Sequence, residues 1–223
     1  MNSLFVAPHP DDELLGCGGT ILRKSSQGDI VGWLLITSVT SEAGWTPQRV
    51  SSRNQEIERV REGLSISPNN IFSLGFPAAQ LDQIPSSQLI AQISTVFKEF
   101  QPQEVFLPHP GDIHTDHRIT FEAVSACTKW FRYPSVQRIM TYETLSETNF
   151  EQHLTSSTFT PNLFIDVSNY LTQKLQLLEI YESELGTHPF PRSLDAVRAL
   201  ALLRGSQRGV EAAEAFQIIK SFE

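Results

Sequence analysis

The sequence predicts an α/β protein with a mostly parallel, doubly wound sheet and helices on both faces. Three observations lead to this fold class. Short apolar runs of strand length recur along the chain, and segments with apolar residues at helical spacing separate them. Two of the apolar runs end abruptly in groups of ionisable residues, as expected where strands of an open sheet lead into a site.

Six apolar runs have the length and composition of buried strands. They are residues 4–8, 29–37, 70–76, 104–108, 138–145 and 162–167. The segments between and after them predict helices, because their apolar side chains recur every three or four residues. These helices cover about 12–24, 51–67, 86–100, 118–130, 170–185 and 193–204, and a last short element ends near residue 222.

Helix caps and breakers set the boundaries of these elements. Asp11 or Asp12 is placed to cap the first helix, and Pro68 ends the second. Polar residues with glycine and proline predict loops at 40–50 and 186–191.

Three glycines in the first predicted helix, Gly16, Gly18 and Gly19, would weaken a free-standing helix. They indicate that this helix lies close to the sheet or to a ligand, and close packing is the simpler explanation. Their spacing is not the Gly-x-Gly-x-x-Gly pattern, so the sequence predicts no dinucleotide site.

Length and composition suit one domain spanning residues 1–223, with 40% apolar residues to build a core. The net charge of −8, from 17 basic and 25 acidic residues, argues against binding to nucleic acid or to an anionic membrane. No stretch approaches the roughly 18 apolar residues of a membrane span, and we see no signal peptide. Cys17 and Cys127 form no metal-type pair, so we expect a cytoplasmic protein.

Two groups of ionisable residues follow predicted strands. The strand at 4–8 leads into His9, Asp11 and Asp12. The strand at 104–108 leads into a second group, which comprises His109, Asp112, His114, Asp116 and His117. Four of the six histidines therefore lie at two points of the chain. Because the ends of two such strands can lie close together in a doubly wound sheet, we expect both groups to form one site.

This combination of residue types favours a metal site. His9 and Asp12 are three residues apart, so one tight turn can supply two ligands, and His117 would supply a third. Two imidazoles and one carboxylate hold zinc and leave a position open for water. The same ligands hold ferrous iron or other divalent ions, so the identity of the metal stays open.

The residues beside the expected ligands have other expected roles. Asp11 would point toward a water on the metal and act as a general base. His114, three residues before His117, would face the substrate, and Asp116 would hold a histidine in the required tautomer or charge state. Each residue taken singly also fits a helix cap, an Asx turn or a solvated side chain. The occurrence of both groups after apolar strands favours function.

Two short motifs make the prediction more specific. Pro8-His-Pro-Asp-Asp-Glu13 and His114-Thr-Asp-His117 stand in the order and at the separation of two signatures of one enzyme family. The sequence thus resembles the LmbE-like, or PIG-L, family of zinc-dependent N-acetyl-sugar deacetylases. Weaker likenesses at 53–56, 74–77 and 208–216 extend the resemblance over nearly the whole chain.

The resemblance implies a Rossmann-like fold in which His9, Asp12 and His117 hold zinc and Asp11 is the general base. It implies that His114 stabilises the oxyanion or protonates the leaving amine, with Asp116 as its partner. The implied reaction removes the acetyl group from a small N-acetylglucosamine-type sugar and releases acetate and a free amine. Family members often form trimers or hexamers, so a homo-oligomer is also expected.

Two further residues are candidates for substrate binding. Arg53 would contact the substrate, or would simply pair with Glu56 at helical spacing. His188 would reach a sugar or a neighbouring subunit, although a loop histidine is more often outside a site. The segment 38–44 differs from a Gly-Glu pair found in many family members, which leaves the preferred aglycone open.

Two alternative functions also stay open. One is a zinc hydrolase that acts on another amide or on an ester, and the other is a metal-stabilised sugar-binding protein without catalysis. Pure binding would need neither Asp11 nor His114, so their presence disfavours the second alternative. Measuring acetate release from a panel of N-acetylated sugars separates these functions.

Overall fold

The computed structural model describes residues 1–41, 43–150 and 158–222. Within these residues, seven strands form one sheet in the order β3-β2-β1-β4-β5-β7-β6. The strands are β1 (Asn2–Ala7), β2 (Ile30–Ser38), β3 (Ile71–Pro77), β4 (Glu104–Pro108), β5 (Arg138–Tyr142), β6 (Leu163–Asp166) and β7 (Ala213–Ser221).

Among these strands, β7 alone points opposite to all the others. The strands from β3 through β5 pair in parallel, whereas β7 pairs antiparallel with both β5 and β6. The expected mostly parallel sheet is therefore confirmed. The last short element predicted near residue 222 is this long strand, and it inserts between β5 and β6 through pairing with distant parts of the chain.

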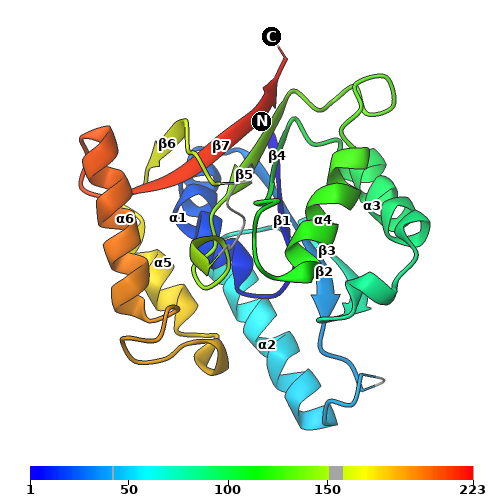
Figure 1. The fold of residues 1–223 in the computed structure, drawn as a ribbon, viewed down its shortest axis with the longest axis horizontal. Coiled ribbons are helices and arrows are strands. Elements are labelled where there is room, and N and C mark those ends of the chain that lie inside the picture. The colour runs from blue at the N-terminus through cyan, green and yellow to red at the C-terminus, as the bar shows by residue number, and fades with distance from the viewer. Residues whose placement is uncertain (42, 151–157, 223) are drawn as a thin grey trace.

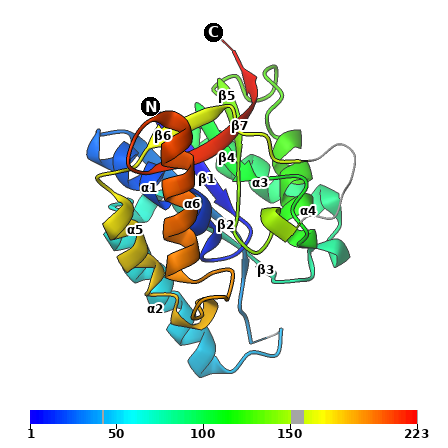
Figure 2. The ribbon, with the colours of Figure 1, turned by 60° about the vertical axis from the view of Figure 1, so that its left-hand side comes forward.

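Helices cover both faces of the sheet, as predicted (Figures 1 and 2). One face packs against α1 (Asp12–Ser26), α2 (Pro47–Gly63), α5 (Leu171–Leu178) and α6 (Leu194–Arg208). The other face packs against α3 (Ser86–Phe100) and α4 (Thr115–Ala126). Successive β1 side chains alternate between the two cores, with Phe5 on the first face and Leu4 and Val6 on the second.

The glycines of α1 allow the helix to lie close to the sheet and to its neighbours. A Cβ atom on Gly16 would lie 2.3 Å from Cδ2 of Tyr142, and one on Gly19 would lie 2.7 Å from Cβ of Val167. Both distances are too short for real atoms, so the simpler explanation of the glycines, close packing, is confirmed. The Tyr142 hydroxyl also donates to the carbonyl of Val6 at 2.7 Å, close to the end of β1.

The chain changes direction across the sheet between β1 and β4. Strands β2 and β3 extend the sheet to one side of β1, whereas β5 extends it from β4 to the other side. Ligands of open α/β sheets bind at such a switch point, outside the carboxyl ends of the strands. The loops after β1 and β4, which carry the two groups of ionisable residues, both begin there.

Several helix boundaries differ from the sequence prediction by about three residues or more, and three of them have a bearing on the site or its neighbours. α2 begins at Pro47 because the Thr46 hydroxyl caps it, accepting from the Arg49 N–H at 3.2 Å. α4 begins at Thr115 rather than near residue 118, because the His114 imidazole acts as the N-cap. Rules for caps look for Ser, Thr, Asp or Asn, and so miss an imidazole. The helix predicted over 170–185 ends at Leu178. None of the described helices has the length and apolar character required to cross a membrane.

Candidate metal centre and catalytic cavity

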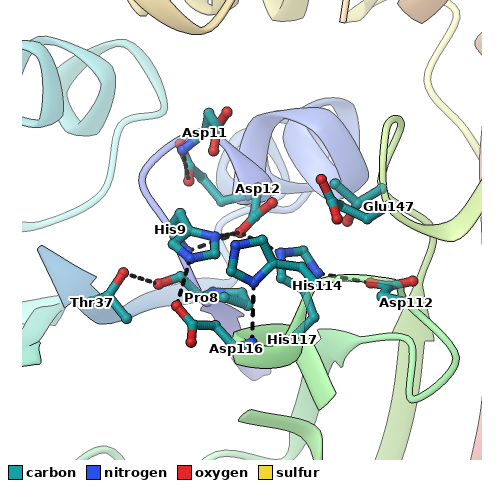
Figure 3. A network of polar contacts seen from close by, with 12 residues as sticks. Pro8, His9, Asp11, Asp12, Thr37, Asp112, His114, Asp116, His117 and Glu147 are labelled. Atoms are coloured by element: carbon teal, nitrogen blue, oxygen red, sulfur yellow. Dashed lines mark hydrogen bonds and ion pairs between the residues drawn. The ribbon is translucent and has the colours of Figure 1, made fainter. Parts of the chain in front are cut away.

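Three side chains from the two loops bring their donor atoms together (Figure 3). His9 and Asp12 come from the turn between β1 and α1, and His117 comes from the first turn of α4. Oδ2 of Asp12 lies 3.3 Å from Nδ1 of His9 and 3.2 Å from Nε2 of His117. One donor atom from each of the three residues lies within 4.8 Å of the others, a spacing suited to one metal ion.

Two further carboxylates orient the imidazole rings. Oδ2 of Asp116 lies 3.0 Å from Nε2 of His9, and Oδ2 of Asp112 lies 2.8 Å from Nδ1 of His117. Each carboxylate holds the ring proton on the nitrogen that faces it, which leaves Nδ1 of His9 and Nε2 of His117 beside Asp12. Metal-binding histidines usually have such an outer hydrogen bond, so the tautomers fit a metal site.

The two orienting carboxylates are themselves fixed by hydrogen bonds. Asp116 accepts from the backbone N–H groups of Ala79 at 2.7 Å and Leu81 at 3.2 Å. Asp112 accepts from the Thr148 hydroxyl at 2.6 Å, and both carboxylates are fully buried. Sequence reasoning placed Asp112 in the second group without a role, because its partner Thr148 lies far along the chain.

The charges of the donor side chains shift one another's pKa values. Burial lowers the pKa of His9, but hydrogen bonds to Asp116 and Asp12 outweigh it and raise the pKa to about 9. Burial raises the pKa of Asp12, but the charge of His117 and bonds to both histidines hold it well below its usual range. Because ligands must lose their protons to bind a metal, metal binding at these groups would compete with protons.

A second group of donors, His9, His114 and Asp116, also lies within 4.8 Å. It is less suited to a metal because both Asp116 oxygens already accept backbone N–H groups, from Ala79 and Leu81. The group also shares His9 with the first set. The set that contains Asp12 and His117 is therefore the better candidate for a metal site.

Asp11 lies beside the donor set on the turn that opens α1 (Figure 3). Although it occupies the N-cap position, its side chain makes no capping hydrogen bond. The carboxyl is 5% exposed and lines the cavity. Burial, followed by the charge of Asp12, raises the pKa of Asp11 to about 8. The alternative role of Asp11, as a side-chain cap of the first helix, is therefore wrong.

His114 lines the same cavity but differs from the expectation in its partner. Its Nδ1 accepts the backbone N–H of Asp116 at 3.1 Å, whereas the Asp116 carboxylate contacts His9. Burial, with the positive charges of His9 and His117, lowers the pKa of His114 to about 4. The expected pairing of His114 with the Asp116 carboxylate is therefore wrong. Asp116 does hold a histidine, but that histidine is His9.

A cavity of about 250 Å³ opens above the donor set. It is bordered by the end of β2, the start of α2, the loop after β3 and the segment between α5 and α6. Lining residues that sequence reasoning did not single out are Trp45, Arg49, Glu147, Glu184 and Arg192. They are scattered along the chain without a motif, although Arg192 lies just after the loop that contains His188.

Comparison with known proteins agrees with this geometry. Residues 4–128, more than half of the chain, match the family described as PIG-L, GlcNAc-PI de-N-acetylase. The chain belongs to the PIG-L family. PIG-L deacetylases are metal-dependent, and the His/Asp donor set is a candidate site for a metal in this member.

Similar PIG-L relatives match over most of the chain. Diacetylchitobiose deacetylase of Thermococcus kodakarensis is 27% identical, covering 97% of this chain and 82% of its own. A probable N-acetyl-alpha-D-glucosaminyl L-malate deacetylase 2 of Bacillus anthracis is 26% identical, and the match covers 82% of this chain and 81% of that protein. The solved structure of a conserved protein from Thermus thermophilus has a TM-score of 0.77 at 26% identity. The match covers 99% of this chain and 95% of that one.

Arg53 lines the cavity of this PIG-L chain, but its guanidinium is largely used within the protein. Nε lies 3.2 Å from Oε2 of Glu56, so the expected pairing at helical spacing is present. Nη1 donates to the Pro10 carbonyl at 3.1 Å, and Nη2 donates to Glu184. The side chain is 4% exposed. These contacts tie α2 to the turn that carries Asp11.

His188 is placed outside the cavity. It is exposed, and it is absent from the described residues that line the cavity. Arg192, four residues later, does line the cavity, so this part of the chain reaches the site through a different side chain. In the segment 38–44, Ser38 and Val39 border the cavity as expected, and Glu42 lies outside the described residues.

Proposed function

We propose that this chain is a zinc-dependent deacetylase that hydrolyses the N-acetyl group of an N-acetylglucosamine-type sugar and releases acetate and a free amine. One observation carries the proposal: a three-donor metal set, a carboxylate and an imidazole all border a single cavity. Membership of the PIG-L family and the named activities of its relatives support it.

His9, Asp12 and His117 would hold the metal. Two imidazoles with fixed tautomers and one ionised carboxylate match a catalytic zinc set with one position left for water. When bound, zinc would acidify a water molecule and polarise the acetyl carbonyl. Ferrous iron uses similar ligands, so metal analysis of the purified protein distinguishes the two.

Asp11 is proposed as the general base. Its carboxylate lines the cavity beside the donor set and is not used to cap α1. It can therefore accept a proton from the attacking water. The same carboxyl group can then return this proton to the leaving nitrogen, which an amide requires before its amine departs.

His114 is proposed as the donor to the developing oxyanion. Since Nδ1 accepts the Asp116 N–H, the ring proton of neutral His114 lies on Nε2, the other nitrogen. A neutral imidazole that lines the cavity can donate this N–H to the acetyl oxygen as its negative charge grows. The hydrogen bond from Asp116 fixes the ring before substrate arrives.

The sugar itself is proposed to contact the cavity wall away from the metal. Trp45 presents an aromatic surface there, and Arg192 presents a guanidinium whose Nε is fixed by the Glu184 carbonyl at 3.1 Å. Ligand cavities commonly combine apolar surfaces with a few placed polar groups. Arg53 and His188 are less suited to this role, because Arg53 is used internally and His188 lies outside the cavity.

Three further properties are proposals. Residues 1–223 would act as one deacetylase domain. The two described cysteines, Cys17 and Cys127, are buried and free, which supports a cytoplasmic location. A trimer or hexamer is proposed on family resemblance, and sedimentation velocity of the purified chain tests it.

The decisive experiment is an acetate-release assay on zinc-loaded protein. The panel contains N-acetylglucosamine, diacetylchitobiose, and N-acetylglucosamine linked to malate or inositol, with an O-acetyl sugar as the ester control. We expect acetate and a free amine from at least one N-acetyl sugar, and loss of activity when a chelator removes the metal. Ester cleavage without amide cleavage, or sugar binding without acetate release, would contradict the proposal.

A further inference from the structure

Asp11 is held in a backbone conformation that residues other than glycine rarely adopt. Its φ is 136° and its ψ is −29°. An unusual backbone of this kind persists only where surrounding contacts enforce it, and such residues cluster at active sites. The conformation also keeps the Asp11 carboxyl from capping α1. What enforces this conformation therefore decides where the proposed base points.

Glu13 makes the direct contact with this backbone. The Asp11 N–H donates to Oε2 of Glu13 at 3.1 Å. The Asp11 carbonyl accepts from the N–H groups of Leu14 and Leu15 at 3.0 and 2.9 Å, so the residue is fixed on both sides. Glu13 is 1% exposed, and its other oxygen accepts from the Tyr181 hydroxyl at 3.3 Å.

Arg53 fixes the residue before Asp11. Its Nη1 donates to the Pro10 carbonyl at 3.1 Å, and its guanidinium carbon lies 5.2 Å from the centre of the Tyr181 ring. Tyr181 thus touches both Arg53 and Glu13. Glu13 and Arg53 therefore bond the backbone of two consecutive residues, and Tyr181 contacts both of these side chains.

We propose that Glu13 is a positioning residue which, with Tyr181 and Arg53, clamps the 10–11 turn and aims the Asp11 carboxylate at the substrate. This inference rests on the proposed deacetylase function. Glu13 is neither a member of the metal donor set nor a cavity-lining residue. It acts through Asp11, because its hydrogen bond is made to the backbone of Asp11.

A matched pair of variants tests the hydrogen bond. Glu13→Leu removes the hydrogen-bond acceptor at similar side-chain volume. Glu13→Gln keeps an oxygen that can accept from the Asp11 N–H, and its NH2 group can contact the Tyr181 hydroxyl. We expect Glu13→Leu to lower kcat by about 100-fold, as small misplacements of catalytic groups can. KM and zinc stoichiometry should stay near those of the wild type, and Glu13→Gln should recover most of the rate.

A double-mutant comparison separates positioning from general damage. If Glu13 acts through Asp11, Glu13→Leu should cost little further activity in an Asp11→Ala background. An equal fold-loss in both backgrounds, or a Glu13→Gln variant as slow as Glu13→Leu, would overturn the inference. If Glu13→Leu does not fold, Tyr181→Phe gives a second test, with a smaller loss of kcat expected at unchanged KM.

Hydrogen exchange of the Asp11 amide, measured by NMR, tests the clamp without any substrate. We expect slow exchange in the wild type and in Glu13→Gln, and exchange at least about tenfold faster in Glu13→Leu. Unchanged exchange in Glu13→Leu would refute the clamp even if the enzyme is an active deacetylase. A protected amide in a protein that releases no acetate would instead count against the proposed function alone.

Discussion

Removing the carboxylate of Asp112 should weaken metal binding although Asp112 is not a ligand. Asp112 is fully buried, and its Oδ2 lies 2.8 Å from Nδ1 of His117. In Asp112→Ala the ring proton of His117 loses its acceptor, and the imidazole is free to turn or change tautomer. Loss of such an outer partner typically costs about 10- to 100-fold in metal affinity, or about 1.4–2.8 kcal/mol.

The structure also predicts the order within a series of variants. Asp112→Asn keeps an oxygen for His117 but loses the negative charge and the bond accepted from Thr148, which spans 2.6 Å. Its loss of zinc affinity should lie near the lower end of this 10- to 100-fold range, at about tenfold. Asp82→Ala removes an exposed carboxylate outside the donor set, so this control should bind zinc like the wild type.

Competition for zinc against a chelator of known affinity, at constant pH, measures these differences. Thermal unfolding of the metal-free variants should be recorded alongside, since a buried unpaired group also lowers stability. Wild-type zinc affinity in a folded Asp112→Ala protein would refute the idea that this carboxylate orients the proposed ligand His117. Equal losses in the alanine and asparagine variants would show that the charge, rather than the hydrogen bond, matters.

Three other predictions concern Asp11, Lys174 and Glu184. Asp11→Ala should keep zinc, whereas the rate of hydrolysis should fall about 10²–10⁴-fold. Metal analysis and acetate release measure the two effects. Loss of zinc with intact hydrolysis would contradict the role of Asp11 as base. Lys174→Met removes the cation that pairs with the buried Glu214 and leaves this carboxylate only the backbone N–H groups of Gly19 and Thr20. The free energy of unfolding, measured with denaturant, should fall by about 3–5 kcal/mol, and a fall below about 1 kcal/mol would argue against a strong pair. Burial raises the pKa of Glu184, but Arg53 outweighs it and lowers the pKa overall. The stability that Glu184 contributes is therefore present above its unfolded pKa of about 4.3 and is lost as pH falls through the lower folded value. Glu184→Gln should be less stable than the wild type at pH 7, and the difference should vanish in acid; a difference independent of pH would refute this linkage.

The sequence was a good guide wherever the signal is local. The apolar runs that became β1 and β4 are nearly continuous, so their burial on both faces could be predicted from composition alone. His9 and Asp12 lie three residues apart, and their shared turn follows from that spacing. The second cluster follows another strand end, and the topology of a doubly wound sheet brings such ends together.

The sequence was a weaker guide where partners come from distant segments. β7 was predicted only as a short final element, because its place between β5 and β6 depends on pairing across the sheet. Arg53 was expected either to contact the substrate or to pair with Glu56. The pairing is present, but its other donors reach Pro10 and Glu184, which no local pattern indicates. His188 was proposed as a substrate-binding residue, but it lies in a loop whose path local sequence does not predict.

The sequence by itself identified the candidate residues: His9, Asp11 and Asp12 after one strand, and His114 and His117 after another. Only the tertiary structure decided how they are coupled. The Asp116 carboxylate binds His9, 107 residues away, rather than His114. This choice depends on how α4 sits against the end of β1, because a side chain bonds the group it faces in space. The same geometry left His114 with a backbone N–H as its partner.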